Sequence, residues 1–391
     1  MKNKVIKNYL LNLAYQILVV VLPLIITPYL TRKLSIEGIG KYSSVYGIAN
    51  LFYYCGMLGI LNYGSKYIAM FQKAEKNELG SHFISIWLIQ LFAGLFFSII
   101  FFIFFIQINL AGNSYFYFLM LPLVVGSIFD ISWFYIGMED MKKTVLRNVF
   151  MKIFTLIFIF TLVKNENDLS KYFLIQSISF TASLILLWFG LHRYISIKNI
   201  NIHIKKHLPQ IFLLFIPIIF SQMYTCFDRT IISFLSSETI SGYYDLTMKI
   251  VKIINPCLTV LGTALLPRIA NLYVNQDYEK LKVYIYKSFS FTIFFSFLFM
   301  GGIIVCADGF VQIFFGENYK ILIPYMMMTS MLVFFIPVGS VFATQVVLPL
   351  NKIYSYIIPI VAAAIIEFGL IFILVPLPPA KIIAPYFIIS S

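Results

Sequence analysis

Long apolar stretches recur along the whole chain, and their length is the feature that most constrains its fold. A helix needs roughly 20 apolar residues to cross about 30 Å of hydrocarbon. About eleven stretches of the 391 residues reach this length. They predict an all-α, polytopic transmembrane helix bundle. The predicted spans are Leu10–Leu30, Tyr42–Leu61, Phe83–Phe105, Tyr115–Gly137, Val145–Val163, Tyr172–Leu191, Leu208–Leu235, Tyr243–Leu266, Phe289–Ala307, Leu322–Leu348 and Tyr354–Val375.

The composition excludes an ordinary soluble protein. Hydrophobic residues make up 60% of the chain and charged residues only 12%, which is too little polar surface for a soluble domain of this size. The net charge of +13 would suit nucleic acid, but the basic residues fall between apolar stretches, so we expect no nucleic-acid partner. The cysteines have no CxxC spacing and are expected to be packing residues: Cys55, Cys226, Cys257 and Cys306.

The distribution of basic residues predicts the orientation in the membrane. If the amino terminus lies inside, 18 of the 29 Lys and Arg residues fall in inside segments and 7 in outside segments. Cytoplasmic segments of membrane proteins carry such an excess of Lys and Arg. The bias therefore predicts a cytoplasmic amino terminus.

A basic segment divides the predicted spans into two sets. Residues 192–207 form the longest basic connection and separate six spans from the next five. A twelfth apolar stretch starts at Ile382 and reaches Ser391 after about ten residues, too few to span. We therefore expect an amino-terminal six-helix lobe (1–191), a cytoplasmic linker (192–207) and a carboxy-terminal lobe (208–391) truncated within its last helix.

An internal repeat supports two related lobes. The segment Leu34–Tyr42, after the first span, aligns with Leu235–Tyr243, after the seventh, and shares Leu-Ser, Glu, Ile and Tyr positions. Each segment follows a helix that enters from the same side. The repeats are therefore expected to be parallel and related by an axis along the membrane normal.

Several segments together resemble a known family. Tyr29–Ser43, Leu58–Lys66, Asp130–Glu139, Asp228–Ile232 and Gly242–Tyr244 resemble bacterial polysaccharide flippases. These translocases of O-antigen and capsule repeat units belong to the multidrug/oligosaccharidyl-lipid/polysaccharide exporter superfamily. The resemblance covers essentially the whole chain.

The resemblance implies a function in polysaccharide biosynthesis. It implies that the chain flips an undecaprenyl-pyrophosphate-linked oligosaccharide repeat unit from the inner to the outer leaflet of the bacterial plasma membrane. Two six-helix lobes would do this by alternating access. Protons or sodium as coupling ions and a polysaccharide polymerase as a partner belong to the same expectation. No bond is made or broken, so we expect neither an enzyme nor a cofactor.

Ionisable residues inside the predicted spans are candidates for the substrate site. Charges at membrane depth are costly and persist where they face a cavity or a partner. Asp228 and Arg229 lie near the outer end of the seventh span. Asp245, Lys249 and Lys252 share one face of the eighth, since they are spaced by four and three residues. These five residues are predicted to bind the pyrophosphate and sugars. A structural ion-pair network, with Asp245 paired to Lys249, is the alternative.

Other charged residues suggest secondary roles. Asp130 in the fourth span and Glu367 in the eleventh are candidates for ion coupling, whereas a helix-end cap and a protonated carboxyl are the respective alternatives. Arg32 and Lys33 end the first span and would contact substrate on release or only anchor the helix.

Alternative functions fit the sequence less well. A drug or cation antiporter of the same superfamily fits a cation-rich cavity poorly. A membrane polysaccharide polymerase or ligase should carry a large outer loop, but no predicted outside segment exceeds roughly 15 residues. Motifs of phosphate-binding loops and zinc hydrolases do not occur. His203 and His207 are four residues apart but have no third ligand nearby, so no metal site is expected.

Overall fold

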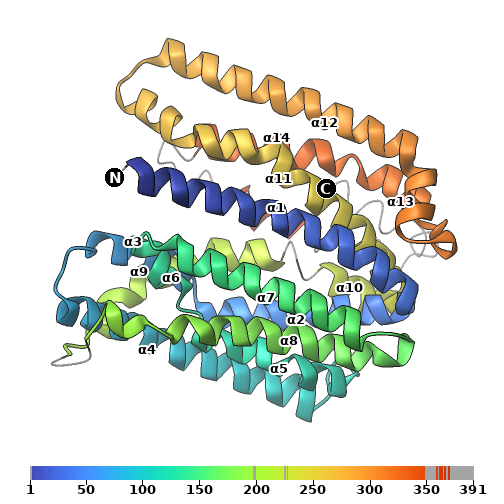
Figure 1. Ribbon diagram of the computed structural model, residues 1–391, viewed down its shortest axis with the longest axis horizontal. Helices are drawn as coiled ribbons and strands as arrows, with labels where there is room; N and C mark the ends of the chain where they lie inside the picture. The colour runs from blue at the N-terminus through green and yellow to red at the C-terminus, as the bar shows by residue number, and fades with distance from the viewer. Residues whose placement is uncertain are drawn as a thin grey trace. The chain divides into compact units, whose positions relative to one another are not determined.

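The computed structural model describes residues 2–196, 200–223, 226, 228–347 and a few positions between 358 and 369. Every regular element within these residues is a helix (Figure 1). The predicted all-α class is therefore confirmed. The chain forms two compact units, the first made of Met1–Gly38 and Tyr42–Thr230, the second of Ile39–Lys41 and Ile231–Ser391.

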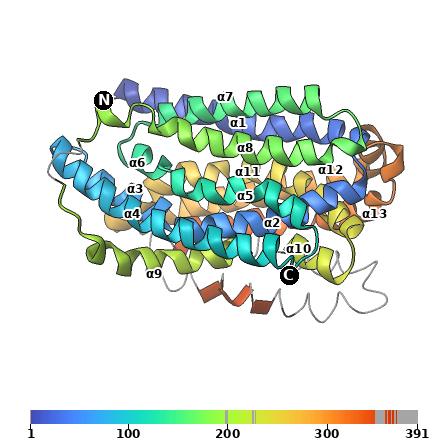
Figure 2. The same ribbon diagram turned by 90° about the horizontal axis from the view of Figure 1, so that it is seen from below.

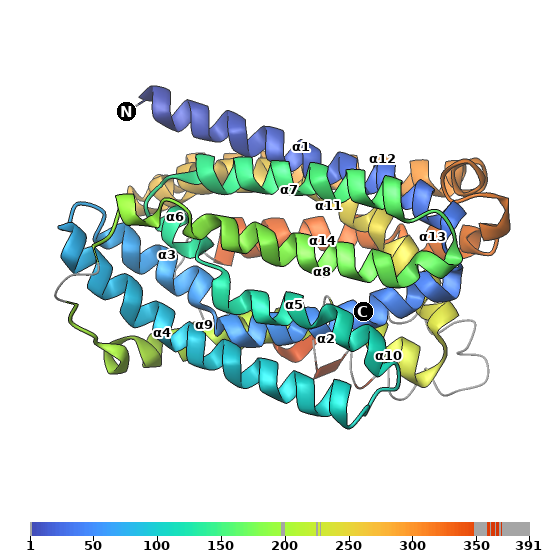
Figure 3. The same ribbon diagram turned by 60° about the horizontal axis from the view of Figure 1, so that its bottom comes forward.

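The described residues of the first unit form nine α-helices. A π-helical turn over Phe102–Gln107 extends one of them. The helices are α1 (Lys2–Lys33), α2 (Ile36–Met57), α3 (Ile60–Met70), α4 (Lys76–Phe101), α5 (Ser114–Phe129), α6 (Ser132–Gly137), α7 (Met141–Leu162), α8 (Leu169–Ile185) and α9 (Ile204–Gln222). In Figure 3, α7, α8, α5 and α4 follow one another as roughly parallel neighbours. Figure 2 shows α9 lying along α4.

The second unit is built on two helices of 37 residues each. α10 (Asp228–Leu235) leads into it, and α11 (Glu238–Val274) packs against α12 (Tyr278–Phe314). The shorter α13 (Leu322–Thr329) and α14 (Leu332–Phe342) pack on both long helices, and a π-helical turn over Ala343–Val347 follows α14.

Eight helices within the described residues are long and apolar enough to cross a membrane. They correspond to the second to seventh, ninth and tenth predicted spans. The first and eighth predicted spans lie within α1 and α11, which are also helical. The number of spans in each lobe stays a prediction. The eleventh span, with Glu367, and the stretch from Ile382 lie outside the described residues.

The fourth predicted span is broken, which corrects the expectation of a continuous helix. It is interrupted at Asp130, whose backbone is extended (φ −77°, ψ 92°) between α5 and α6. Hydropathy predicts depth in the bilayer and does not report helix breaks, since an apolar stretch remains apolar on both sides of one.

A second break ends α2. Leu58 and Gly59 have positive φ angles of 45° and 76°, a conformation that favours glycine. The nitrogen of Phe215 in α9 would lie 2.9 Å from a Cβ added at Gly59. Glycine therefore serves both the turn and the close approach of α9.

Aromatic side chains fill the interior of the first unit. Phe83, Trp133 and Phe134 are fully buried. The rings of Phe83 and Trp133 stack with centroids 5.3 Å apart, and Phe134 meets Phe83 edge-on at 5.2 Å. This packing fixes short α6 against α4 and holds the break at Asp130 in place.

Candidate functional site

Two charged residues start α10. Asp228 and Arg229 are only 4% and 8% exposed. Oδ1 of Asp228 accepts a hydrogen bond of 2.7 Å from the backbone N–H of Arg229. A carboxylate in the first turn of a helix also interacts favourably with the helix dipole. The first turn of α10 therefore holds a buried acid that is stabilised by a backbone donor.

Small and polar residues of α2 accommodate the Arg229 side chain. Its Nη1 donates to Oγ of Ser43 at 3.3 Å, and its Nε lies 4.0 Å from Oδ1 of Asp228. One residue further, Thr230 donates to the carbonyl oxygen of Ser44 at 2.8 Å. Arg229 is thus a buried cation held by a neutral hydroxyl acceptor as well as by one carboxylate.

Close packing of α2 explains this arrangement. A Cβ added at Gly47 would lie 2.5 Å from the carbonyl oxygen of Cys226 and 2.6 Å from Oγ1 of Thr230. One turn later, Asn50 donates to Sγ of Cys226 at 3.2 Å. Small residues let membrane helices approach each other closely. Ser43 and Asn50 were not predicted as site residues, although the spacing of Ser43, Gly47 and Asn50 places them on one helix face.

The second charged group lies on α11. Nζ of Lys249 is 2.9 Å from Oδ2 of Asp245, and their side chains are 27% and 5% exposed. Lys252 lies almost one turn further and is exposed. Asp245 and Lys249 therefore form the ion pair that the spacing of four residues allows.

The five predicted substrate residues belong to different compact units. Asp228 and Arg229 fall in the first, and Asp245, Lys249 and Lys252 in the second. Each unit thus contains buried charged residues. The five residues together comprise three cations and two carboxylates. A common cavity lined by both groups stays a prediction.

Asp130 lies in a polar network at the break between α5 and α6. Its Oδ2 accepts from the hydroxyl of Tyr53 at 2.5 Å, and its Oδ1 accepts from the backbone N–H of Ser132 at 2.9 Å. Tyr53 and Asp130 are each 6% exposed. Both carboxylate oxygens therefore have a donor, and the buried carboxylate connects α2 to the first residue of α6.

Gln90 connects this network to the aromatic interior. Its Nε2 donates to the carbonyl oxygens of Asp130 at 2.9 Å and Ser127 at 2.5 Å, and its Oε1 accepts from Nε1 of Trp133 at 3.0 Å. The fully buried Gln90 thereby satisfies backbone groups that the break leaves without helical partners. Gln90 was not predicted as a site residue, although it is a lone amide in a long apolar stretch.

The remaining predicted residues have simpler surroundings. Arg32 is exposed in the last turn of α1, and its Nη1 donates to the carbonyl oxygen of Pro28 at 2.6 Å. Lys33 ends the same helix. Basic side chains at a helix end stabilise its carbonyl groups, so anchoring accounts for this contact. Glu367 lies outside the described residues.

His207 has a packing role within α9. Its Nδ1 lies 2.7 Å from the hydroxyl of Tyr63, and its ring meets Tyr67 edge-on at 4.8 Å. No group of three or more His, Cys, Asp or Glu that could hold a metal ion occurs among the described residues.

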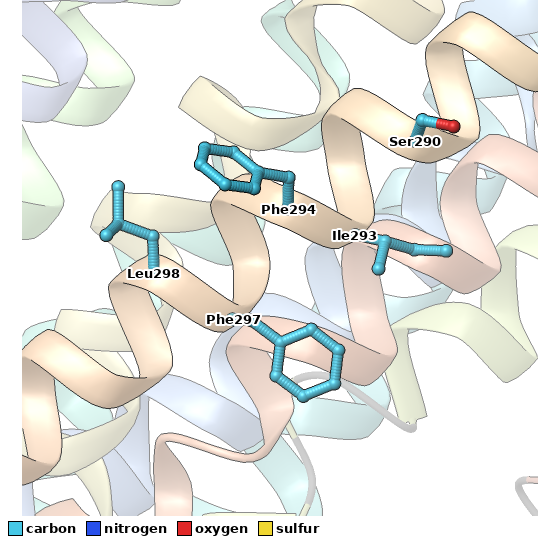
Figure 4. A pocket seen from close by; sticks show the side chains of 5 residues that line it. All are labelled: Ser290, Ile293, Phe294, Phe297 and Leu298. Carbon is cyan, nitrogen blue, oxygen red and sulfur yellow. The ribbon is translucent and has the colours of Figure 1, made fainter.

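A hollow of about 600 Å³ lies on α12 (Figure 4). Four of its five lining side chains are apolar, and the fifth is a serine: Ile293, Phe294, Phe297, Leu298 and Ser290. Such a lining is suited to contact with the hydrocarbon chains of lipids. It carries no charge for a phosphate, so the hollow is separate from the charged candidate residues.

The chain is similar in sequence to a protein family and to curated relatives. The family model described as polysaccharide biosynthesis protein matches residues 5–273. A curated relative from Shigella dysenteriae, described as a putative O-antigen transporter, is 24% identical over 340 residues, which cover 84% of this chain and 83% of the relative. A relative from Escherichia coli (strain K12) with the same description is 24% identical over 359 residues, covering 90% and 85%.

Solved structures show the same fold. A structure of the lipid II flippase MurJ in an inward closed conformation has a TM-score of 0.73 at 15% identity and covers 98% of this chain and 85% of its own. An inward-facing multidrug resistance MATE family transporter has a TM-score of 0.71 at 14% identity, covering 98% and 92%. The fold is thus that of multi-pass transporters, and the predicted membrane character is confirmed.

Proposed function

Because the chain belongs to the polysaccharide biosynthesis protein family, we propose that it transports a lipid-linked oligosaccharide across the plasma membrane of a bacterium. The substrate is an undecaprenyl-pyrophosphate-linked repeat unit, which moves from the inner to the outer leaflet. The amino terminus and the linker 192–207 face the cytoplasm. Two lobes alternate between inward and outward access.

The relatives support a transporter rather than an enzyme. Both curated relatives are described as putative O-antigen transporters, and the MurJ structure is described as a lipid II flippase. A lipid II flippase shows that this fold can carry a lipid-linked head group. A polymerase or ligase therefore has no support in these comparisons.

Buried Arg229 is the observation that carries the proposal. A pyrophosphate loses its hydration inside the membrane and needs cations to replace water. A guanidinium can offer two parallel donors to a phosphate. Arg229 is 8% exposed, and Ser43 and Asp228 position it. We assign it the pyrophosphate, together with Lys249 and Lys252.

The carboxylates have supporting roles in this proposal. Asp228 orients Arg229, and Asp245 holds Lys249 until the phosphate replaces it as the partner of the ammonium group. Asp130, in the first unit, is proposed to couple transport to protons or sodium, as is Glu367. Arg32 and Lys33 are assigned to release at the outer face. A polysaccharide polymerase is the proposed downstream partner.

A drug or cation antiporter is the second candidate, because a MATE family transporter shares the fold. Cationic drugs would meet Arg229, Lys249 and Lys252, and like charges repel. The excess of cations over carboxylates therefore favours an anionic head group.

An export assay tests the proposal. Cells that lack their own copy of the protein would receive the wild type, Arg229→Gln or Arg229→Lys. Both variants should reduce surface polysaccharide at least tenfold and leave lipid-linked oligosaccharide in the inner leaflet, since a lysine cannot replace the two-donor fork. Protein abundance is measured in parallel.

Lys282→Gln is the matched control, because Lys282 is 74% exposed and pairs only locally with Glu279. It should export normally. Normal export by Arg229→Gln at normal abundance would overturn the assignment of Arg229. Normal export by cells without the protein would overturn the function.

A further inference from the structure

A cluster of basic side chains precedes the apolar part of α9. Lys205 and Lys206 lie in the first turn of the helix, and His203 comes directly before its first residue. All three are exposed, and the first turn holds no acidic residue. We call these three residues the basic cluster. It is a local excess of positive charge on the surface of the first unit.

The basic cluster lines a hollow of about 510 Å³. Two isoleucines complete the lining, which consists of Ile202, His203, Ile204, Lys205 and Lys206. Ile202 is 52% exposed. The hollow therefore offers cationic and apolar groups to the same ligand.

Contacts with α4 hold the segment before α9 in place. α9 packs against α3 and α4 (Figure 2). The backbone N–H groups of Asn201 and His203 donate to Oγ of Ser81 at 3.1 Å and to Oγ of Ser85 at 3.0 Å. The backbone of the hollow is thus fixed to two serines one turn apart on α4.

Contacts with α3 hold the first turn of α9. Nδ1 of the fully buried His207 lies 2.7 Å from the hydroxyl of Tyr63. Nζ of Lys206 lies 5.9 Å from the centre of the Tyr67 ring, and a cation over an aromatic face is attracted to it. The helix start and one of its cations therefore have defined positions without a ligand.

The place of the basic cluster along α9 corresponds to the head groups of a bilayer. α9 is long and apolar enough to cross a membrane, and its uninterrupted apolar run begins at Ile211. Lys205 and Lys206 precede this run by about 8 Å of helix axis. Basic side chains next to a spanning segment reach the head groups and attract anionic lipids.

The exposed face of α9 beyond the basic cluster is apolar. Phe212, Leu213 and Ile216 follow Lys205 by seven, eight and eleven residues, which places all four on one side of the helix. The three apolar side chains are 51%, 53% and 45% exposed. A charged end followed by an apolar face is complementary to a whole lipid molecule, whereas a free anion would use only the charged end.

We propose that the start of α9 binds an anionic phospholipid. Lys205, Lys206 and His203 surround its phosphate in the hollow, and its acyl chains extend along Phe212 and Leu213. The bound lipid holds the end of the linker at the membrane surface. This site goes beyond the proposed transport and does not depend on which substrate the chain moves.

Thermal unfolding of the purified full chain in detergent tests binding. Phosphatidylglycerol should raise the Tm of the wild type saturably, by about 2 °C or more, because a ligand that binds only the folded state stabilises it. Phosphatidylcholine with the same acyl chains should need at least about tenfold more lipid for the same rise, since it carries no net charge. Glycerol 3-phosphate, which has the phosphate but no acyl chains, should give no rise at equal concentration.

A double variant removes the two lysines. Lys205→Gln with Lys206→Gln should raise the half-saturating concentration of phosphatidylglycerol about tenfold or more, because each lysine near an anionic head group contributes about fivefold. Its Tm without lipid should stay close to that of the wild type, since both side chains are exposed. Lys205→Arg with Lys206→Arg keeps the charge and should retain the affinity.

Lys280→Gln with Lys282→Gln is the matched control. It removes the same charge from two lysines that are 68% and 74% exposed and pair locally with Asp277 and Glu279. This variant should keep the half-saturating concentration of the wild type. An equal loss of affinity in the control would show an effect of net charge alone and overturn the site.

Three other outcomes would also overturn the proposal. The first is an equal response of the wild type to phosphatidylglycerol and phosphatidylcholine, or no response to either. The second is unchanged affinity for phosphatidylglycerol in Lys205→Gln with Lys206→Gln. The third is an equal rise with glycerol 3-phosphate, which would assign the hollow to a soluble phosphate compound instead of a lipid.

Discussion

The hydroxyl of Tyr53, near the carboxy-terminal end of α2, donates a hydrogen bond to Asp130, 77 residues later at the break between α5 and α6. With the N–H of Ser132 as the second donor, this bond satisfies a buried carboxylate from two sides. Asp130 lies at the break between α5 and α6, so its polar partner most distant in sequence, Tyr53, acts at this break.

Tyr53→Phe should destabilise the protein by about 1–3 kcal/mol, because Oδ2 of Asp130 would be buried without its donor. Tyr54→Phe is the control, since the hydroxyl of this neighbouring residue does not bond to Asp130. The measurement is Tm in detergent. An equal Tm for both variants would show that the bond contributes nothing to stability.

Gln90→Leu should lower Tm more than Tyr53→Phe does. It removes the donor to two carbonyl groups and the acceptor of the Trp133 indole N–H, and each unsatisfied group is costly. Combining Gln90→Leu with Trp133→Phe removes the indole N–H as well. This double variant should therefore lose less than the sum of the two single variants.

Gly47→Ala should destabilise the first unit by about 1–3 kcal/mol, because the added methyl group collides with Cys226 and Thr230. Gly302→Ala on α12 is the matched control. No heavy atom lies within 4 Å of a Cβ added there, and alanine favours a helix by about 1 kcal/mol over glycine. A lower Tm for Gly302→Ala than for Gly47→Ala would refute the close approach.

Variants of Asp245 and Lys249 distinguish a structural role of this ion pair from a role in transport. Lys249→Gln leaves a carboxylate that is 5% exposed without its cation, so Tm and abundance should fall. Adding Asp245→Asn should restore both but not export, because the phosphate still lacks Lys249. Restored export by the double variant would assign the pair a purely structural role.

Cysteine labelling tests the orientation. In a background without the four native cysteines, Asn201→Cys in the linker should resist a membrane-impermeant thiol reagent in intact cells. Glu317→Cys, in the connection between α12 and α13, should react. Both residues are exposed, so accessibility of the side chain does not bias the comparison. The opposite result would invert the predicted topology.

The sequence predicted the helical class, because this follows from hydropathy, whereas the depth of the charges in the membrane stays a prediction. It did not predict the break at Asp130. A helix break depends on partners such as Gln90 and Trp133, which are 43 residues apart. Ser43 was missed for the same reason, since its role appears only when α10 lies against α2.

The shortness of α6 has a consequence for the order of folding. Its six residues cover about 9 Å of helix axis, and helices shorter than about 12 residues are marginal on their own. Trp133 in α6 contacts Phe83 and Gln90, which come more than 40 residues earlier in α4. We therefore expect α6 to become stable only after α4 has formed.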